Sequence, residues 1–242
     1  MTELLFRLDP YGHDAQGTVL SSTPEGIVLD RTLFYPRAGG QPGDSGTLRW
    51  GTEAGFTHAD ITEATKGPDG NVLHVPAKGA ELPPVGSAVI ASLDWNRRHR
   101  HMRMHTALHL LCAVMPGIYA TGNQIGAEKS RLDFDLPEPP TKEWLTERLN
   151  ALIAADHKVS ERWITEAELD ANPGLVRTLS VQPPRGAGQI RLVCIGPEDL
   201  PVDLQPCGGT HVRSTGEIGG VEVTKLESKG RQNRRVTLVL KD

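Results

Sequence analysis

The stretch HMRMHTALHLL, residues 101–111, combines a helical pattern of apolar side chains with two histidines four residues apart. The apolar spacing predicts an amphipathic helix over residues 96–114. His105 and His109 are separated by just over one helical turn, so both imidazoles leave the same face. They lie at the edge of the apolar stripe, where a metal ion could bind partly sheltered from water. Taken alone, the pair is weak evidence for a metal, because two histidines at this spacing more often mark a core edge or a solvated face.

A second set of metal-binding residue types lies far downstream, in CGGTH at residues 207–211. Zinc prefers cysteine thiolate and neutral imidazole, and Gly208 and Gly209 let the backbone fold tightly between the two ligands. His105, His109, Cys207 and His211 together supply three nitrogens and one sulfur, which is a complete tetrahedral set. The sequence therefore predicts a zinc site, with a buried thiol beside a surface histidine as the alternative.

The bulk properties predict a reduced, cytoplasmic protein. The chain has 242 residues, enough for two modest domains, and no apolar run as long as a membrane span. The N-terminus lacks the layout of a signal peptide, and three cysteines cannot form a full set of disulfides. Cys112 and Cys194 fall in apolar patterns and are expected to be buried. The net charge of −4 argues against a non-specific nucleic-acid coat but allows a local basic patch.

The pattern of elements predicts an α+β protein of two domains. Residues 1–94 contain short strand-like pieces between turn residues, which indicates a small β-barrel, or a sandwich as the alternative. The expected strands are 3–8, 17–21, 27–30, 56–62, 72–75 and 85–93. Residues 95–242 predict an antiparallel sheet with helices on one face. Helices are expected at 96–114, 141–155 and 166–170, and strands at 130–136, 159–164, 190–195, 219–226 and 235–240.

A glycine-rich loop, FYPRAGGQPGDSG at residues 34–46, interrupts the first domain. Gly39 and Gly40 would let the backbone approach a ligand, and Arg37, Gln41 and Asp44 would supply polar contacts. A structural connection between strands is the alternative, and composition alone favours it. The loop lacks the lysine and hydroxyl residue of a nucleotide-triphosphate loop.

Two basic clusters indicate contacts with phosphate. Arginines at the start of a helix oppose its dipole, which suggests that they serve a ligand, with a solvated helix end as the alternative. The second cluster could likewise be only solvated surface. The candidate nucleic-acid contacts are Arg97, Arg98, Arg100, Arg103, Lys229, Arg231, Arg234 and Arg235.

Together these motifs resemble a known family. HTALHLL, CGGTHV, STGEIGG, NRRV and the glycine-rich loop are similar to the free-standing alanyl-tRNA editing proteins, the AlaX family, in their medium-length form. They also resemble the editing domain of alanyl-tRNA synthetase and, more distantly, that of threonyl-tRNA synthetase. The resemblance implies a β-barrel followed by a two-layer editing domain, with Zn²⁺ as cofactor. Its implied partner is tRNA(Ala) charged with serine or glycine, deacylated without ATP.

One position departs from the family pattern. Synthetase-embedded domains often have Ser-Ala-Thr between the two histidines, where this chain has Thr106, Ala107 and Leu108. The hydroxyl after the first histidine is kept as Thr106, whereas the one before the second is lost at Leu108. Any role of that second hydroxyl is therefore in doubt.

The implied reaction is hydrolysis of the ester between a wrong amino acid and the terminal ribose. The site must accept serine and reject alanine, which requires a hydrogen bond to the serine hydroxyl. Thr121 and Gln124 are the candidates for that contact, with a polar turn as the alternative. Thr106, Gln124 and the backbone amides of Gly208 and Gly209 are the candidate catalytic groups.

Zinc could act in either of two ways. It could lower the pKa of a bound water to about 7, or it could hold the substrate and order the pocket. Four protein ligands favour the second. Rival functions are a zinc-stabilised RNA-binding module, a zinc hydrolase of small esters and a threonyl-type editing hydrolase.

Overall fold

The computed structural model describes residues 2–52, 55–136, 138, 140–179, 183, 185, 186, 188–230 and 233–241. Contacts within the chain divide it into two compact units, Met1–His99 and Arg100–Asp242. The division falls inside helix α1 (Trp95–Ala113), a few residues after the predicted boundary at 94. Among the described residues, no helix is both long enough and apolar enough to cross a membrane.

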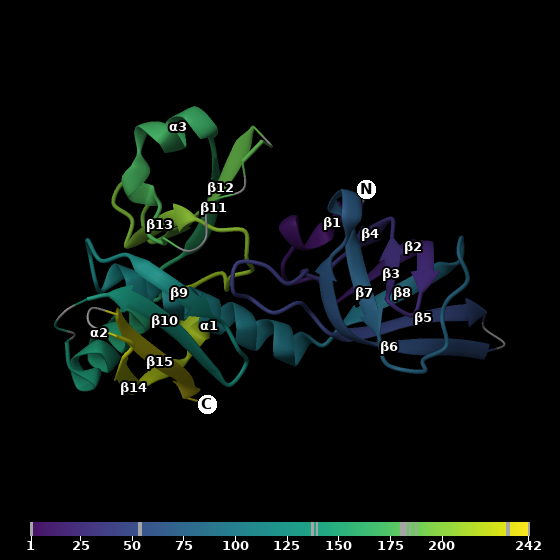
Figure 1. Cartoon of the computed structure of the whole chain (residues 1–242), viewed down its shortest axis with the longest axis horizontal. Helices are drawn as coiled ribbons and strands as arrows, with labels where there is room; N and C mark the ends of the chain where they lie inside the picture. Colours follow the sequence, from purple (N-terminus) through teal and green to yellow (C-terminus); the bar gives the residue numbers. More distant parts are fainter. Residues whose placement is uncertain are drawn as a thin grey trace. The chain divides into compact units, whose positions relative to one another are not determined.

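Six antiparallel strands of the first unit close into a barrel in the order β2-β3-β7-β6-β5-β8 (Figure 1). They are β2 (Asp14–Thr23), β3 (Gly26–Leu29), β5 (Gly46–Thr52), β6 (Gly55–Lys66), β7 (Val72–Pro76) and β8 (Ala88–Leu93). Alternate side chains of each strand point inward, as the pleat requires. Val19, Ile27, Leu48, Ile61 and Val89 are among the buried residues that fill the interior. The predicted β-barrel is therefore confirmed.

The start of the chain differs from its prediction. Residues 3–8 form only a two-residue strand, β1 (Glu3–Leu4), which pairs in parallel with β4 (Arg31–Thr32), and then a 3-10 turn, η1 (Leu5–Arg7). The amide of Leu8 donates to the carbonyl of Leu5 at 2.9 Å, so the chain bends before it can continue the strand. Strand β5 was not predicted, because its glycines conceal the apolar alternation. A second 3-10 turn, η2 (Pro68–Gly70), joins β6 to β7.

The second unit contains a four-stranded antiparallel sheet in the order β14-β15-β10-β9 (Figure 1). Its strands are β9 (Ala120–Gln124), β10 (Lys129–Asp135), β14 (Gly220–Ser228) and β15 (Asn233–Lys241). Helix α2 (Lys142–Ala154) packs beside β14 and buries Leu145, Leu149 and Ile153, which recur at helical spacing. The Asn150 side chain joins the two elements, because its carboxamide bonds both the amide and the carbonyl of Val221.

A smaller antiparallel sheet of the second unit has the order β11-β12-β13. It consists of β11 (Val159–Thr165), β12 (Gln189–Ile195) and β13 (Asp203–Pro206). Helix α3 (Glu166–Ala171) begins with a capping box between Thr165 and Glu168 and packs on this sheet. Two 3-10 turns, η3 (Pro173–Leu175) and η4 (Thr215–Ile218), complete the unit. The α+β class is confirmed, although β9 and β13 were not predicted because neither alternates clearly.

Helix α1 is buried more completely than an amphipathic helix would be. Asp94 caps its start, because Oδ1 accepts a hydrogen bond from the amide of Arg97 at 3.1 Å. At and just past its end, Arg177 donates to the carbonyls of Cys112 and Met115, which also accept from the backbone amides of Met115 and Ile118. From residue 101 to 112, every position except Arg103 is buried. His105 and His109 were expected to be half sheltered from water, and both are instead buried.

Candidate metal centre

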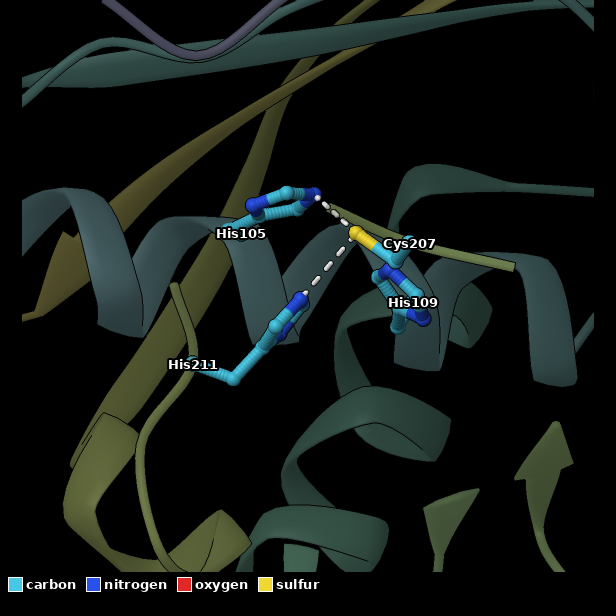
Figure 2. Close-up of side chains that lie close together, drawn as sticks. All are labelled: His105, His109, Cys207 and His211. Atoms are coloured by element: carbon cyan, nitrogen blue, oxygen red, sulfur yellow. Dashed lines mark hydrogen bonds between the residues drawn. The ribbon is translucent and has the colours of Figure 1, made fainter. Parts of the chain in front are cut away.

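The four predicted ligands lie together in the second unit (Figure 2). His105 and His109 extend from α1, and Cys207 and His211 come from the loop that follows β13. Their ligand atoms all lie within 4.8 Å of one another. The Cys207 sulfur is 3.4 Å from Nε2 of His105 and 3.3 Å from Nε2 of His211. Two segments about a hundred residues apart in sequence thus present three nitrogens and one sulfur to one point.

The donor set has the chemistry that tetrahedral zinc requires. The pKa shifts of Cys207 and His211 favour the ionisation states that bind a metal. Burial alone would raise the pKa of the Cys207 thiol, but His105 and His211 beside it hold that pKa well below its usual value. Burial and the neighbouring His105 also hold the pKa of His211 well below normal. These shifts favour a thiolate and a neutral imidazole, so the residues fit zinc.

Thr106 fixes the orientation of His211. Its hydroxyl donates to the carbonyl of Met102 at 3.0 Å, so its oxygen is left to accept from Nδ1 of His211 at 3.1 Å. The same oxygen accepts from the amide of Val212. Nδ1 of His211 therefore carries the ring proton, and Nε2 keeps the lone pair that a metal needs. Thr106 is fully buried, and its position supports a ligand-orienting role rather than the catalytic one predicted from sequence.

His109 is held by a carboxylate that the sequence analysis missed. Its Nδ1 lies 2.8 Å from Oδ2 of Asp203 at the start of β13. Burial lowers the pKa of His109, but hydrogen bonds to Asp203 and Cys207 outweigh it and raise that pKa to about 10. These partners that favour a proton would equally favour a metal cation. Asp203 could not be predicted, because β13 has no clear strand pattern and Asp203 lies outside both metal-ligand motifs.

Arg191 holds the shape of the ligand loop. Its guanidinium donates to the carbonyls of Cys207 at 2.7 Å and Gly209 at 2.9 Å. The amide of Gly209 approaches the Cys207 sulfur at 3.4 Å, so it supports the thiolate rather than a substrate. Gly208 is exposed, and a Cβ added there would meet open space. Of the two predicted backbone donors, only Gly208 faces solvent.

Thr121 and Gln124 belong to strand β9. The Thr121 hydroxyl donates to Asn233 at 3.2 Å, at a bulge between β9 and β10. The Gln124 carboxamide accepts from Arg131 at 3.1 Å and is exposed. Their hydrogen bonds are made to the sheet and not to the metal ligands, so the structure does not join these two candidates to the centre.

The glycine-rich loop is built around a tight turn in the first unit. Ala38 and Gln41 exchange two backbone hydrogen bonds, and Gly39 and Gly40 between them have φ of 59° and 87°, which favours glycine. Gln41 and Asp44 are buried, with exposed fractions of 0% and 1%. Their placement supports the structural alternative, because neither side chain is open to a substrate. The Gly39–Gly40 turn remains exposed.

The arginines at the start of α1 bond to the protein itself. Arg98 is fully buried and pairs with Asp44, and it also donates to the carbonyl of Leu33 at 2.7 Å. The prediction that Arg98 contacts nucleic acid is therefore wrong, because its guanidinium cannot reach a phosphate. The other three arginines are partly buried, and each donates to a backbone carbonyl: Arg97 to Gly43, Arg100 to Ala127 and Arg103 to Ile218.

The second basic cluster lies at the β14–β15 end of the four-stranded sheet. Arg235 makes a bidentate pair with Asp133 at 2.8 Å, and Lys229 lies 3.7 Å from Glu227. Arg234 donates to the carbonyl of Gly230. Arg231 falls outside the described residues. The cluster is thus partly neutralised by acidic neighbours.

Two family models match the chain. The model for the second additional domain of threonyl and alanyl tRNA synthetases matches residues 190–237, which include the CGGTH loop. A class II (A) tRNA synthetase model matches residues 10–97. An alanyl-tRNA editing protein AlaX-M of Methanosarcina mazei is 40% identical over the whole of this chain and 98% of its own. The chain belongs to the AlaX-M family.

Further relatives bear out the family and its wider relationship. The AlaX-M protein of Saccharolobus solfataricus is 33% identical, with both chains covered in full. The alanine–tRNA ligase of Pyrobaculum aerophilum is 37% identical over 93% of this chain, which corresponds to 25% of the ligase. The predicted resemblance to AlaX proteins is confirmed, and this AlaX-M chain corresponds to one segment of the synthetase.

Proposed function

We propose that this AlaX-M protein is a zinc-dependent aminoacyl-tRNA hydrolase that removes serine from mischarged tRNA(Ala) in trans. Glycine is proposed as a second amino acid that it removes. The observation that carries the proposal is the convergence of four metal-ligand atoms within 4.8 Å of one another. Membership of the alanyl-tRNA editing family supports the substrate.

The proposed reaction is ester hydrolysis. Water adds to the carbonyl carbon of the aminoacyl ester, the bond from that carbon to the ribose oxygen breaks, and the ribose oxygen takes up a proton to become a hydroxyl. The free amino acid leaves with the oxygen of the water in its carboxyl group. When bound by His105, His109, Cys207 and His211, zinc would supply a fixed positive charge that orders the pocket and attracts electron-rich groups of the substrate. The protein holds His211 through Thr106 and keeps the Cys207 loop in place through Arg191.

Serine is the proposed amino acid because a synthetase for alanine discriminates weakly against one extra hydroxyl. A site that hydrogen-bonds the serine hydroxyl rejects alanine, which would leave a polar group unpaired. Thr121 and Gln124 on β9 are proposed for this contact, and the exposed Gly208 backbone is proposed to lie against the ester. The tRNA contacts proposed are Arg97, Arg100, Arg103 and the cluster of Lys229, Arg231, Arg234 and Arg235.

The test is a deacylation panel with the full chain. Ser-, Gly-, Ala- and Thr-charged tRNAs would each be incubated with metal-replete protein, with chelated protein and with the variant His105→Ala. We expect rapid loss of serine from tRNA(Ala), slower or equal loss of glycine, and intact Ala-tRNA(Ala). The chelated protein and His105→Ala should both be inactive.

Three results would contradict the proposal. Survival of Ser-tRNA(Ala) alongside intact tRNA binding would indicate an RNA-binding module. Faster hydrolysis of the Thr-charged tRNA would indicate threonyl-type editing. Equal activity on a small seryl ester, without a steep dependence on salt, would indicate an esterase, because phosphate contacts make tRNA binding salt-dependent.

A further inference from the structure

A pair of polar residues on β13 meets a pair on α1 behind the metal ligands. Asp203 and Gln205 are two residues apart on a strand, so they share a face. His109 and Cys112 are three residues apart on α1, so they also share a face. The exposed fractions of Asp203, Gln205 and Cys112 are 4%, 7% and 5%. Two pairs of side chains from distant segments of the sequence thus form one buried row.

The hydrogen bonds of this row converge on the Asp203 carboxylate from two sides. Gln205 Nε2 donates to both oxygens of Asp203, at 3.0 and 2.9 Å. Oδ2 of Asp203 in turn accepts from Nδ1 of His109 at 2.8 Å. Gln205 also interacts with the Cys112 thiol, whose pKa is raised to about 12 by burial and by the charge of Asp203. Gln205 therefore orients the carboxylate, and the carboxylate orients the imidazole.

Burial of the Asp203 carboxylate costs free energy, and packing alone does not explain why it is buried. A buried carboxylate is strongly destabilising unless it is paired and hydrogen-bonded. In the described part of the chain, its ion-pair partner is His109, which is itself a ligand candidate. No arginine or lysine among those residues forms an ion pair with it, in contrast to the buried Asp44, which pairs with Arg98. The position of Asp203 is thus explained by what it does to His109.

We infer that Asp203 is a positioning residue of the proposed metal centre, which holds His109 by Nδ1 and so leaves Nε2 as the atom that would bind the ion, and that Gln205 holds Asp203 in turn. The inference rests on the zinc binding in the proposed function. Because Nδ1 of His109 donates to the carboxylate, its ring proton is fixed there and Nε2 is left as the donor. The negative charge also makes the imidazole a stronger ligand.

Two substitutions separate the two effects of Asp203. Asp203→Asn keeps the side-chain shape and an oxygen that can accept from Nδ1, but it removes the charge. Asp203→Ala removes both the charge and the acceptor. Asp170→Asn is the matched control, because Asp170 is an exposed aspartate paired with Arg185 and lies away from the row. Gln205→Leu tests the outer member.

The experiment measures zinc affinity of the purified full chain by competition with a chromophoric chelator, and the visible absorption of the Co²⁺-substituted protein. We expect Asp203→Ala to bind zinc about 10- to 100-fold more weakly, as is typical when such a partner is lost. Asp203→Asn should lie between it and the native chain. Both variants should shift the Co²⁺ absorption, whereas Asp170→Asn should leave affinity and spectrum unchanged.

The outcomes distinguish this inference from the proposed function. A native chain that binds no zinc would overturn the proposed metal site and the inference with it. A native chain that binds zinc, with unchanged affinity and Co²⁺ spectrum in Asp203→Asn, would overturn the inference alone. If Asp203→Ala fails to fold, Asp203→Asn decides. A loss of stability in the metal-free variant with undiminished zinc affinity would show a merely structural role and would also overturn it.

Discussion

At the scale of single residues, neutral histidines are fixed by the partner of their second ring nitrogen. His211 donates to Thr106 beside the metal ligands, and in the barrel His74 donates from Nδ1 to the carbonyl of Ile27 at 2.9 Å. Nε2 of His74 then accepts from the Thr32 hydroxyl at 2.7 Å. One arrangement prepares a metal ligand, and the other keeps a core histidine uncharged.

The Thr106 hydroxyl should matter for metal binding. Thr106→Val removes the acceptor for Nδ1 of His211, so the ring proton is no longer held there, and zinc affinity should fall about 10- to 100-fold. Thr106→Ser keeps the hydroxyl and should restore most of the affinity. Chelator competition would measure both. Equal zinc affinity in the valine and serine variants would refute the orienting role.

His74 should make the barrel sensitive to acid. Burial lowers its pKa to about 4, against a hydrogen bond to Ile27 that raises it, whereas the unfolded value is about 6.5. Between these values the unfolded chain binds the extra proton, so stability is full above about pH 6.5 and falls as the pH drops toward 4. The loss from this one residue should be on the order of 3 kcal/mol.

Urea unfolding of the native chain, His74→Gln and His58→Gln between pH 4 and 7.5 would measure this effect. The His74→Gln chain should take up about one proton fewer on unfolding in this range. Its free energy of unfolding should therefore depend less steeply on pH. His58 is the matched control, since it lies exposed on the same barrel, and its replacement should leave the slope as it was. A slope that is the same for all three chains would argue against a buried, neutral His74.

At the scale of elements, the start and the middle of helix α1 have different roles. Its first turns anchor the glycine-rich loop through Arg98 and Asp44, and its middle presents His105 and His109. The arginines that oppose the helix dipole are compensated by the carbonyls and the carboxylate that they contact. Arg98 in the first turns of the helix therefore stabilises the fold of the barrel unit.

Breaking the Arg98–Asp44 pair should destabilise the first unit. Arg98→Met leaves the Asp44 carboxylate buried without its counter-charge, which typically costs about 3–5 kcal/mol. Arg98→Met combined with Asp44→Leu removes both charges and should recover much of that loss. Urea unfolding would measure each chain. Arg185→Ala, which breaks an exposed ion pair, is the control. If Arg98→Met alone lost no more stability than Arg185→Ala, this account would be contradicted.

The elements show which parts of the site can be predicted from sequence. His105 and His109 are predictable because helical spacing alone places them on one face, and Cys207 and His211 because their residue types match zinc. Asp203 is not, because its role depends on a short strand, β13, that carries no period of its own. Arg98 is not either, since a buried arginine within a basic run has the same sequence pattern as a solvated one.

At the scale of the whole molecule, the chain divides into two compact units. The barrel was predictable from frequent turn residues and short apolar pieces, and the α+β unit from its helical and strand periods. Strands β5 and β9 were harder to predict, because glycines conceal the apolar alternation in β5 and a bulge interrupts β9. All four proposed metal ligands lie in the second unit, so a bound metal should stabilise that unit and not the barrel.

Zinc removal should therefore affect one unit selectively. A ligand present at a thousand times its Kd stabilises the folded state by about 4 kcal/mol. Calorimetry with excess chelator should lower the unfolding temperature of the second unit and leave the barrel transition in place. His105→Ala should unfold like the chelated native chain whether or not zinc is added. A chelator that changes neither transition, or His105→Ala still stabilised by zinc, would contradict the prediction.

The central claim, that two distant segments bind one zinc ion, is tested most directly by X-ray absorption at the zinc edge of the purified protein. We expect one sulfur at about 2.3 Å and three nitrogens at about 2.0–2.1 Å, with the sulfur contribution lost in Cys207→Ser. Zinc found without a sulfur neighbour, or protein that retains no zinc, would contradict the account.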